Sequence, residues 1–178
     1  ELHYLRDENM RVAIIGCGSI ARQRHAHEYS LNSNVEIAGF FDFVSERAQE
    51  LAEEYGSKAY SSLDELLEDK SVDAVSVCVA NAYHAETTIK ALRSGKHVLC
   101  EKPMAISLED CEEMIKEAER SGKRLMIGHN QRLTPAHRRA KEIIASGEMG
   151  KVLTFFSMFG HGGPESWSIE KSRNTWFF

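Results

Sequence analysis

A glycine-rich turn near the start of the chain has the residue types and spacing to bind a phosphate group. Residues 16–21 read GCGSIA, the pattern GxGxxA, between an apolar run and a segment of helical periodicity. At such a junction Gly16 permits a tight turn, Gly18 lets the backbone approach a pyrophosphate, and the small Ala21 lets helix and strand pack closely. The helix N-terminus adds N–H groups and a positive dipole end. The predicted dinucleotide-binding residues of this turn are Gly16, Gly18, Ser19, Ile20 and Ala21.

An acidic residue closes the next apolar run. Asp42 follows Gly18 by 24 residues, and a carboxylate at a spacing of about 20 binds the adenosine ribose in dinucleotide-binding proteins. Such a carboxylate repels a 2′-phosphate, so Asp42 favours NAD over NADP as the cofactor. The nearby Arg47, a second candidate cofactor contact, moderates that preference. The alternative is that Asp42 caps the helix expected after it.

A glutamate, a lysine and a proline, Glu101 to Pro103, directly follow a later apolar run. The end of a parallel strand on the cofactor side is where reacting groups are expected. Taken alone, Lys102 also fits an ordinary exposed lysine in a turn. The Lys102–Pro103 peptide bond is a candidate for the cis form.

Apolar runs alternate with amphipathic segments between residues 11 and 129, the pattern of a parallel sheet covered by helices on both faces. The fold class is therefore α/β. Strands are predicted at 11–15, 35–41, 59–60, 74–79, 97–100 and 125–128. Helices are predicted at 20–29, 46–55, 63–67, 85–94 and 108–121. Helix-start signals at Ser62 and Ser107 and helix-ending glycines at Gly56, Gly95 and Gly122 support these bounds.

The pattern changes after residue 129. A polar turn leads into a predicted helix over 136–145, and a strand over 152–159 is expected to open a second sheet. The predicted organisation is a tail-like leader at 1–9, an NAD-binding domain at 10–129, and the incomplete start of a substrate and dimerisation domain at 130–178.

Composition excludes several other classes of protein. The chain has 22 Lys and Arg against 27 Asp and Glu, a net charge of −5, which argues against nucleic-acid and anionic-membrane partners. Its apolar runs are shorter than the roughly 18 residues of a membrane span.

The cysteines and histidines indicate neither a disulfide nor a metal site. The four cysteines form no CxxC pair, and His25 and His27 point to different helix faces. We expect a cytoplasmic protein.

These motifs together resemble the Gfo/Idh/MocA oxidoreductases, the group of glucose-fructose oxidoreductase and inositol dehydrogenase. The matching features are residues 12–21, Asp42, 81–84, 101–103, 130–132 and 141–152. The resemblance implies an N-terminal Rossmann domain with a parallel sheet, followed by an α/β domain with a mostly antiparallel sheet. It implies an NAD(P)-dependent enzyme that transfers hydride to or from a hydroxyl carbon of a sugar, an inositol-like polyol or a related metabolite.

The resemblance also assigns roles to residues. It implies that Lys102 is catalytic and that Glu101 lies by the nicotinamide and its ribose. Further cofactor-cleft residues implied by the resemblance are Asn81, His84, Asn130 and Arg132. Without the resemblance, the position of His84 is typical of a residue that starts a helix.

The resemblance also concerns parts of the protein beyond the cofactor cleft. Relatives often pair through the second sheet, which implies a homo-oligomer. The histidine that usually acts with the catalytic lysine in these relatives lies in a segment expected after Phe178. Many relatives have Thr-Pro where this chain has Val79-Ala80. Two alternatives stay open, namely a non-catalytic NAD-binding regulatory protein and an NAD-dependent glycosidase.

Overall fold

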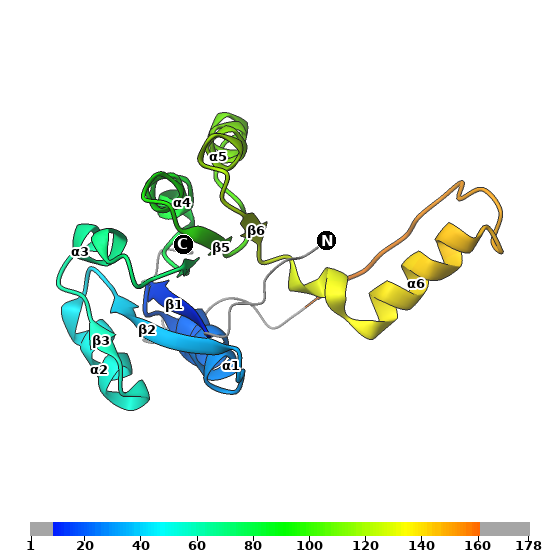
Figure 1. The fold of residues 1–178 in the computed structure, drawn as a ribbon. Coiled ribbons are helices and arrows are strands. Elements are labelled where there is room, and N and C mark those ends of the chain that lie inside the picture. Colours follow the sequence, from blue (N-terminus) through cyan, green and yellow to red (C-terminus); the bar gives the residue numbers. More distant parts are fainter. Residues whose placement is uncertain (1–8, 161–178) are drawn as a thin grey trace.

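The computed structural model describes residues 9–160. Their centre is a six-stranded, all-parallel sheet with the order β3-β2-β1-β4-β5-β6 (Figure 1). The strands are β1 Met10–Ile15, β2 Val35–Phe41, β3 Lys58–Ala59, β4 Ala74–Val77, β5 His97–Cys100 and β6 Leu125–Ile127. The parallel sheet predicted from the alternating pattern is confirmed, and this strand order is that of a doubly wound dinucleotide-binding fold.

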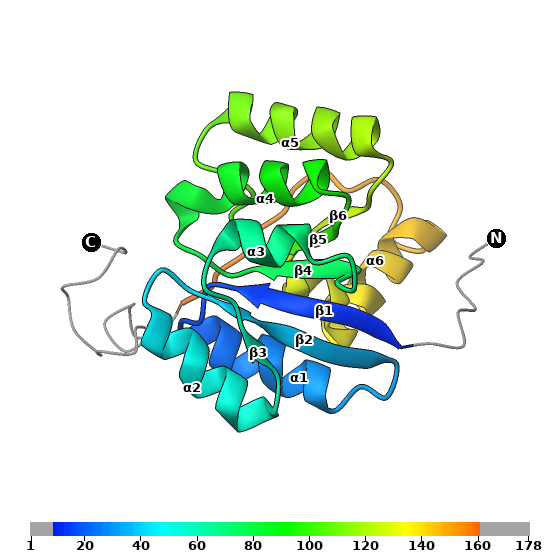
Figure 2. The same ribbon diagram turned by 60° about the vertical axis from the view of Figure 1, so that its left-hand side comes forward.

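The helices cover both faces of the sheet. Figure 2 shows α3, α4 and α5 on one side and α1 and α2 on the other. Their bounds are α1 His27–Ser30, α2 Ser45–Tyr55, α3 Leu63–Glu68, α4 His84–Arg93, α5 Leu108–Ser121 and α6 Pro135–Ser146. Shorter segments are the π-helix η1 Ala21–Ala26 and the 3-10 helices η2 Asn81–Tyr83 and η3 Asn130–Leu133.

Two apolar layers join these helices to the sheet. On one face, Leu92 of α4 and Met114 of α5 pack with Val75 and Val98 of the central strands. On the other face, Leu51 of α2 packs with Ile14 and Phe40. Because both faces of the central strands are buried, their sequences are continuous apolar runs and not alternating ones.

The predicted helix ends are largely confirmed. Ser62 and Ser107 accept hydrogen bonds from the Glu65 and Asp110 backbone N–H groups, which caps α3 and α5. Gly56 and Gly122 end α2 and α5 in the left-handed conformation. The helix predicted over 20–29 also forms, but its first part is the π-helix η1, which the local pattern did not indicate.

The strand predicted over 152–159 is wrong for the described structure. The chain has no regular secondary structure there, and apolar side chains such as Leu153 and Phe156 are exposed. A strand needs a hydrogen-bonding neighbour, and the residues described here form one parallel sheet without an antiparallel partner for it. Residues 1–8 of the predicted leader and residues 161–178 of the predicted second domain lie outside the described residues.

Helix α6, predicted over 136–145, is confirmed, and it stands apart from the sheet in Figure 1. None of its residues is buried. Among residues 9–160, no helix combines the length and the apolar character needed to cross a bilayer.

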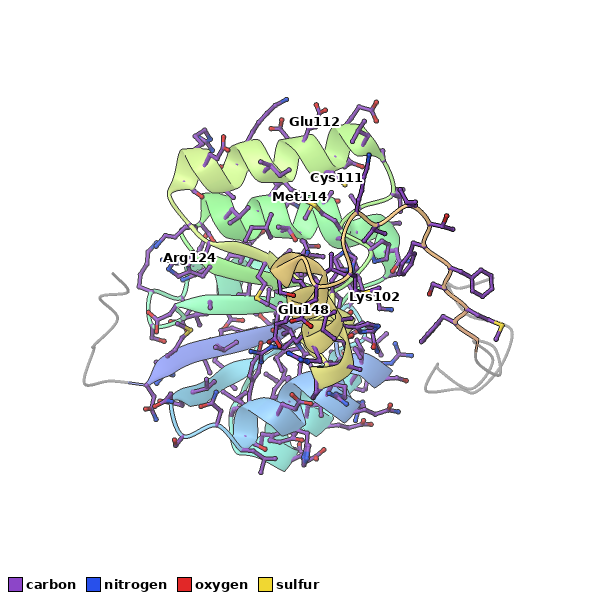
Figure 3. The ribbon with its side chains drawn as sticks, turned by 90° about the vertical axis from the view of Figure 1, so that its right-hand side faces the viewer. Lys102, Cys111, Glu112, Met114, Arg124 and Glu148 are labelled. Carbon is purple, nitrogen blue, oxygen red and sulfur yellow. The ribbon has the colours of Figure 1, made fainter. Side chains whose placement is uncertain are left out.

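Met114 and its neighbour Ile115 provide a matched test of this packing. Met114 of α5 is labelled in Figure 3 and is fully buried. Ile115, the next residue of the same helix, is 49% exposed. We expect Met114→Ala to lower the free energy of unfolding by about 2–5 kcal/mol, because it leaves a cavity in the apolar layer. Ile115→Ala should change it by roughly 0.5 kcal/mol or less. Urea unfolding followed by circular dichroism measures both, and equal effects would contradict this packing.

Candidate functional site

Four loops of interest are fixed at one edge of the sheet. Backbone hydrogen bonds continue the strand pairing just past the strand ends, with donor–acceptor distances of 2.7–2.9 Å. The N–H groups of Gly16, Cys78, Glu101 and Gly128 donate to the carbonyls of Phe41, Ile15, Val77 and Cys100 respectively. The strand order reverses between β1 and β4, and ligands of such sheets bind in the crevice at that point.

The phosphate loop has two glycines in different surroundings. Gly16 has φ +93°, and a Cβ there would lie 2.7 Å from the backbone of Cys78 and Val79. A Cβ on Gly18 would meet nothing within 4 Å. Gly16 is therefore required by the fold, while the space beside Gly18 is open to a ligand.

The helix after this loop offers its N-terminus to the same space. It begins at Ser19, and its first backbone bond runs from the Arg22 N–H to the Gly18 carbonyl, at 3.1 Å. The N–H groups before Arg22 have no acceptor within the helix, which makes this end suitable for a phosphate. Ile20 is 37% exposed at the opening, and Ala21 is fully buried against the sheet.

Asp42 holds the phosphate loop from the end of β2. Its Oδ2 accepts a hydrogen bond from the Cys17 backbone N–H at 2.6 Å, and its Oδ1 accepts one from the Val44 N–H at 2.8 Å. Burial, with the Asp42 charge as the second cause, raises the pKa of the Cys17 thiol to about 12. Val44 precedes α2 without a side-chain cap, so the alternative that Asp42 caps α2 is wrong. Each carboxylate oxygen keeps a further lone pair for a ribose hydroxyl.

An arginine that the sequence analysis did not single out links the loop to α2. The Arg22 Nε donates to the Cys17 carbonyl at 3.1 Å, and its Nη2 donates to the Arg47 carbonyl and the Glu50 carboxylate. Arg47 itself is partly buried at the start of α2. Positive charge therefore lies close to Asp42.

Two exposed aromatic side chains flank this region. Phe43 and Tyr83 follow β2 and β4, are 77% and 52% exposed, and have ring centroids 6.4 Å apart. Large apolar rings with this exposure, at the edge of the sheet where ligands of such folds bind, are candidates for stacking on a base. Neither residue was predicted from the sequence, although Phe43 directly follows the predicted ribose-binding residue.

The loop after β4 is tied to the Lys102 loop by His84. Asn81 begins η2 and is partly exposed, as expected of a residue that contacts a ligand. His84 is 1% exposed, and its ring nitrogens lie 2.6 Å from the Pro103 carbonyl and 3.0 Å from the Val79 carbonyl. His84 is also the first residue of α4, so the helix-start interpretation is confirmed, while a contact with cofactor stays a prediction.

Glu101 and Lys102 leave β5 at the same edge. Lys102, labelled in Figure 3, is exposed. Its peptide bond to Pro103, a candidate for the cis form, is cis. Glu101 Oε1 lies 3.0 Å from His25 Nε2, and Oε2 accepts the Lys102 N–H at 3.1 Å. Burial acts to raise the pKa of Glu101, but the hydrogen bonds from His25 and the Lys102 amide, with nearby positive charge, hold that pKa below its ordinary value.

Asn130 and Arg132 lie on η3, after β6, and both are exposed. The strand order places them beyond the Lys102 loop as seen from the phosphate loop. Among the described residues, no group of three or more His, Cys, Asp or Glu side chains could hold a metal ion.

The sequence has a family match that covers most of this edge. Residues 10–129 match the family model GFO_IDH_MocA, described as an oxidoreductase family with an NAD-binding Rossmann fold. The chain belongs to the Gfo/Idh/MocA oxidoreductase family. The matched segment contains all six strands and every loop described above except η3.

Named members of the family are similar to this chain. The 1,5-anhydro-D-fructose reductase of Ensifer adhaerens is 35% identical over 165 residues, 90% of this chain and 49% of that protein. The inositol 2-dehydrogenase of Salmonella paratyphi B is 33% identical over 81% of this chain and 44% of that protein. The crystal structure of KijD10, a 3-ketoreductase from Actinomadura kijaniata in complex with NADP, has 31% identity and a TM-score of 0.74 over 81% of this chain and 46% of that one. The chain thus spans about half the length of these relatives.

We expect alanine substitutions at the two glycines of the phosphate loop to cause different defects, one in cofactor binding and one in stability. Gly18→Ala should leave the free energy of unfolding nearly unchanged but abolish dinucleotide binding, because the added methyl group fills the open space. Gly16→Ala should destabilise the fold by more than about 1 kcal/mol, since alanine disfavours positive φ and clashes with backbone. Thermal unfolding and NAD titration of both variants check this. A Gly18→Ala protein that binds NAD normally would place the ligand elsewhere.

Proposed function

We propose that this chain is the cofactor-binding part of an NAD-preferring oxidoreductase that transfers hydride to or from a hydroxyl carbon of a sugar, polyol or related metabolite. One observation carries the proposal: the Asp42 carboxylate is hydrogen-bonded to the phosphate loop on the same sheet edge that presents Lys102. The activities of the relatives, a sugar-derivative reductase and an inositol dehydrogenase, support the substrate class.

The residues at this edge fit a nicotinamide dinucleotide. Gly18 and the N-terminus from Ser19 would receive the pyrophosphate, and Asp42 would bind the adenosine ribose. Phe43 and Tyr83 would stack on the adenine, and the nicotinamide end would lie toward Asn81, Glu101 and Lys102. When bound, the cofactor supplies the hydride acceptor or donor, and the protein supplies binding and orientation.

The preference for NAD rests on the fixed charge of Asp42. Its two backbone hydrogen bonds hold the carboxylate in place, so a 2′-phosphate would meet an anion that cannot turn away. Arg22, which is bonded to the phosphate loop, already donates to the Cys17 carbonyl, the Arg47 carbonyl and the Glu50 carboxylate. KijD10 was solved with NADP, so the preference for NAD is proposed for this chain and not for the family as a whole.

Lys102 would act on the substrate hydroxyl. It is exposed at the end of β5, so its ammonium can reach a substrate at the nicotinamide end. There the ammonium would hydrogen-bond to the oxygen whose proton is lost. After it gives one of its own protons to solvent, the lysine can take up the hydroxyl proton, so that one proton passes from substrate to solvent and the ammonium is restored. Glu101 keeps the backbone of Lys102 in place through its Oε2.

We further propose that residues 130–178 begin a second domain, which has a mostly antiparallel sheet, completes the substrate site and pairs the protein as a homo-oligomer. The exposed face of α6 and the exposed Leu153, Phe155 and Phe156 support this, because apolar surface of this size is normally covered. Residues Asn130 and Arg132 would then border the substrate. The free, buried cysteines Cys17, Cys78 and Cys100 favour a cytoplasmic protein.

Asp42→Ala tests the cofactor assignment. We expect NAD affinity to fall at least about tenfold, because a hydrogen bond to a charged group is lost, while the ratio of NADP to NAD affinity rises as the repulsion disappears. Asp64→Ala, which removes an exposed carboxylate from α3, serves as the control of equal charge. Isothermal titration calorimetry with both cofactors measures these changes, and unchanged NAD binding in Asp42→Ala would reject this ribose contact.

Lys102→Met tests the catalytic role in the complete enzyme. We expect kcat to fall by roughly 10²–10⁴, the usual contribution of a general acid–base group, while the Kd for NAD changes by less than about threefold. Lys116→Met, which removes an exposed lysine from α5, should retain full activity. Steady-state kinetics with polyol and sugar substrates provides the readout. A Lys102→Met enzyme with normal turnover would favour a protein that binds NAD without using this lysine for catalysis.

A further inference from the structure

A buried row of hydrogen-bonded side chains runs from the phosphate-loop helix to Glu101. The Tyr29 hydroxyl lies 2.5 Å from Ser76 Oγ, and that oxygen lies 3.2 Å from His25 Nδ1. The other ring nitrogen of His25, Nε2, lies 3.0 Å from Glu101 Oε1. The His25 and Glu101 side chains are only 8% and 13% exposed. The row therefore connects the helix that would bind pyrophosphate with the loop that presents Lys102.

Donor and acceptor chemistry gives this row one direction. An ionised carboxylate can only accept, so His25 Nε2 carries the proton and donates to Glu101. In a neutral ring Nδ1 then accepts, so Ser76 donates to it and accepts in turn from the Tyr29 hydroxyl. With this neutral tautomer of His25, every member of the row has a partner, and Glu101 carries the row's one charge.

The π-helix η1 explains how His25 reaches this position. The segment Ala21–Ala26 buries Ala21, His25 and Ala26 on the sheet side of the helix. A π-turn widens the helix and shifts the direction of its side chains, and such turns occur frequently at functional sites. The ring of His25 also packs edge-on against Tyr29, which fixes its orientation.

Two hydrogen bonds and one close backbone contact hold the Glu101 carboxylate. His25 binds Oε1 and the Lys102 amide binds Oε2. A Cβ on Gly128 would lie 3.2 Å from Oε1, so the carboxylate lies close against the backbone of that glycine. Without His25, the most buried of these contacts is lost and the carboxylate is free to rotate.

We propose that His25 is a positioning residue that fixes the Glu101 carboxylate relative to the phosphate-binding helix. The hydrogen bond from His25 holds the Glu101 side chain, and Glu101 in turn accepts the Lys102 amide. The distance from Glu101 and Lys102 to the pyrophosphate end of the site is therefore fixed. The nicotinamide half of the cofactor is then bound in one orientation. This inference rests on the cofactor site proposed above.

The test compares NADH with ADP-ribose, which lacks the nicotinamide. His25→Asn keeps a polar group near Ser76 but is too short to reach Glu101, and we expect it to weaken NADH binding about tenfold while ADP-ribose binding stays within about twofold. His25→Gln places an amide nitrogen near the position of Nε2, so it should restore NADH binding to within about threefold of the wild type. Ser76→Ala, which leaves the Glu101 bond in place, should also bind NADH within about threefold of the wild type. Fluorescence titration for NADH and calorimetry for ADP-ribose provide the affinities.

The outcomes separate the two proposals. Equal weakening of both ligands in His25→Asn, or no rescue by His25→Gln, overturns the positioning role while leaving the cofactor site intact. A folded wild-type chain that binds neither ligand overturns the cofactor site and this inference with it. A measurement on the unaltered chain is independent of variant folding: 15N NMR of the histidine ring should show His25 protonated at Nε2. A neutral ring protonated only at Nδ1 overturns the proposal.

Discussion

The parallel pairing of β1 with both β2 and β4 is the constraint on which the rest of the structure depends. Parallel strands place all their carboxyl ends at one edge, and reversal of strand order on either side of β1 opens a crevice there. The pairing continues past the strand ends through the Gly16 and Cys78 amides. Loops distant in sequence are therefore fixed within one small region before any ligand binds.

Fixed charges then give this edge its chemistry. Asp42 accepts two backbone hydrogen bonds, and Glu101 accepts one from the backbone and one from His25, so both carboxylates are oriented without a ligand. Orientation before binding lowers the entropic cost of recognition. Lys102 is exposed at the same edge of the sheet, just after β5. In the function that we propose, the fold would thus separate rigid binding groups from an accessible reacting group.

Much of this arrangement could be predicted from the sequence, because it is encoded locally. The GxGxxA turn, the buried strands and the serine caps each follow from residues adjacent in the chain. The row from Tyr29 to Glu101 could not be predicted, since its members are brought together only by tertiary structure, and the π-turn that aims His25 has no marker in the local pattern. The strand predicted over 152–159 failed for the converse reason: its apolar residues are typical of a strand, but pairing depends on a neighbour.

The central claim is that a dinucleotide binds across the crevice from the phosphate loop to Glu101. The most direct measurement is a titration of the 15N-labelled chain with NAD, followed by amide NMR shifts. The account predicts saturable shifts that are largest at Gly18, Ser19 and the residues around Asp42, with smaller ones at Glu101 and Lys102. Shifts confined to the opposite edge of the sheet, or none in a folded chain at millimolar NAD, would contradict it.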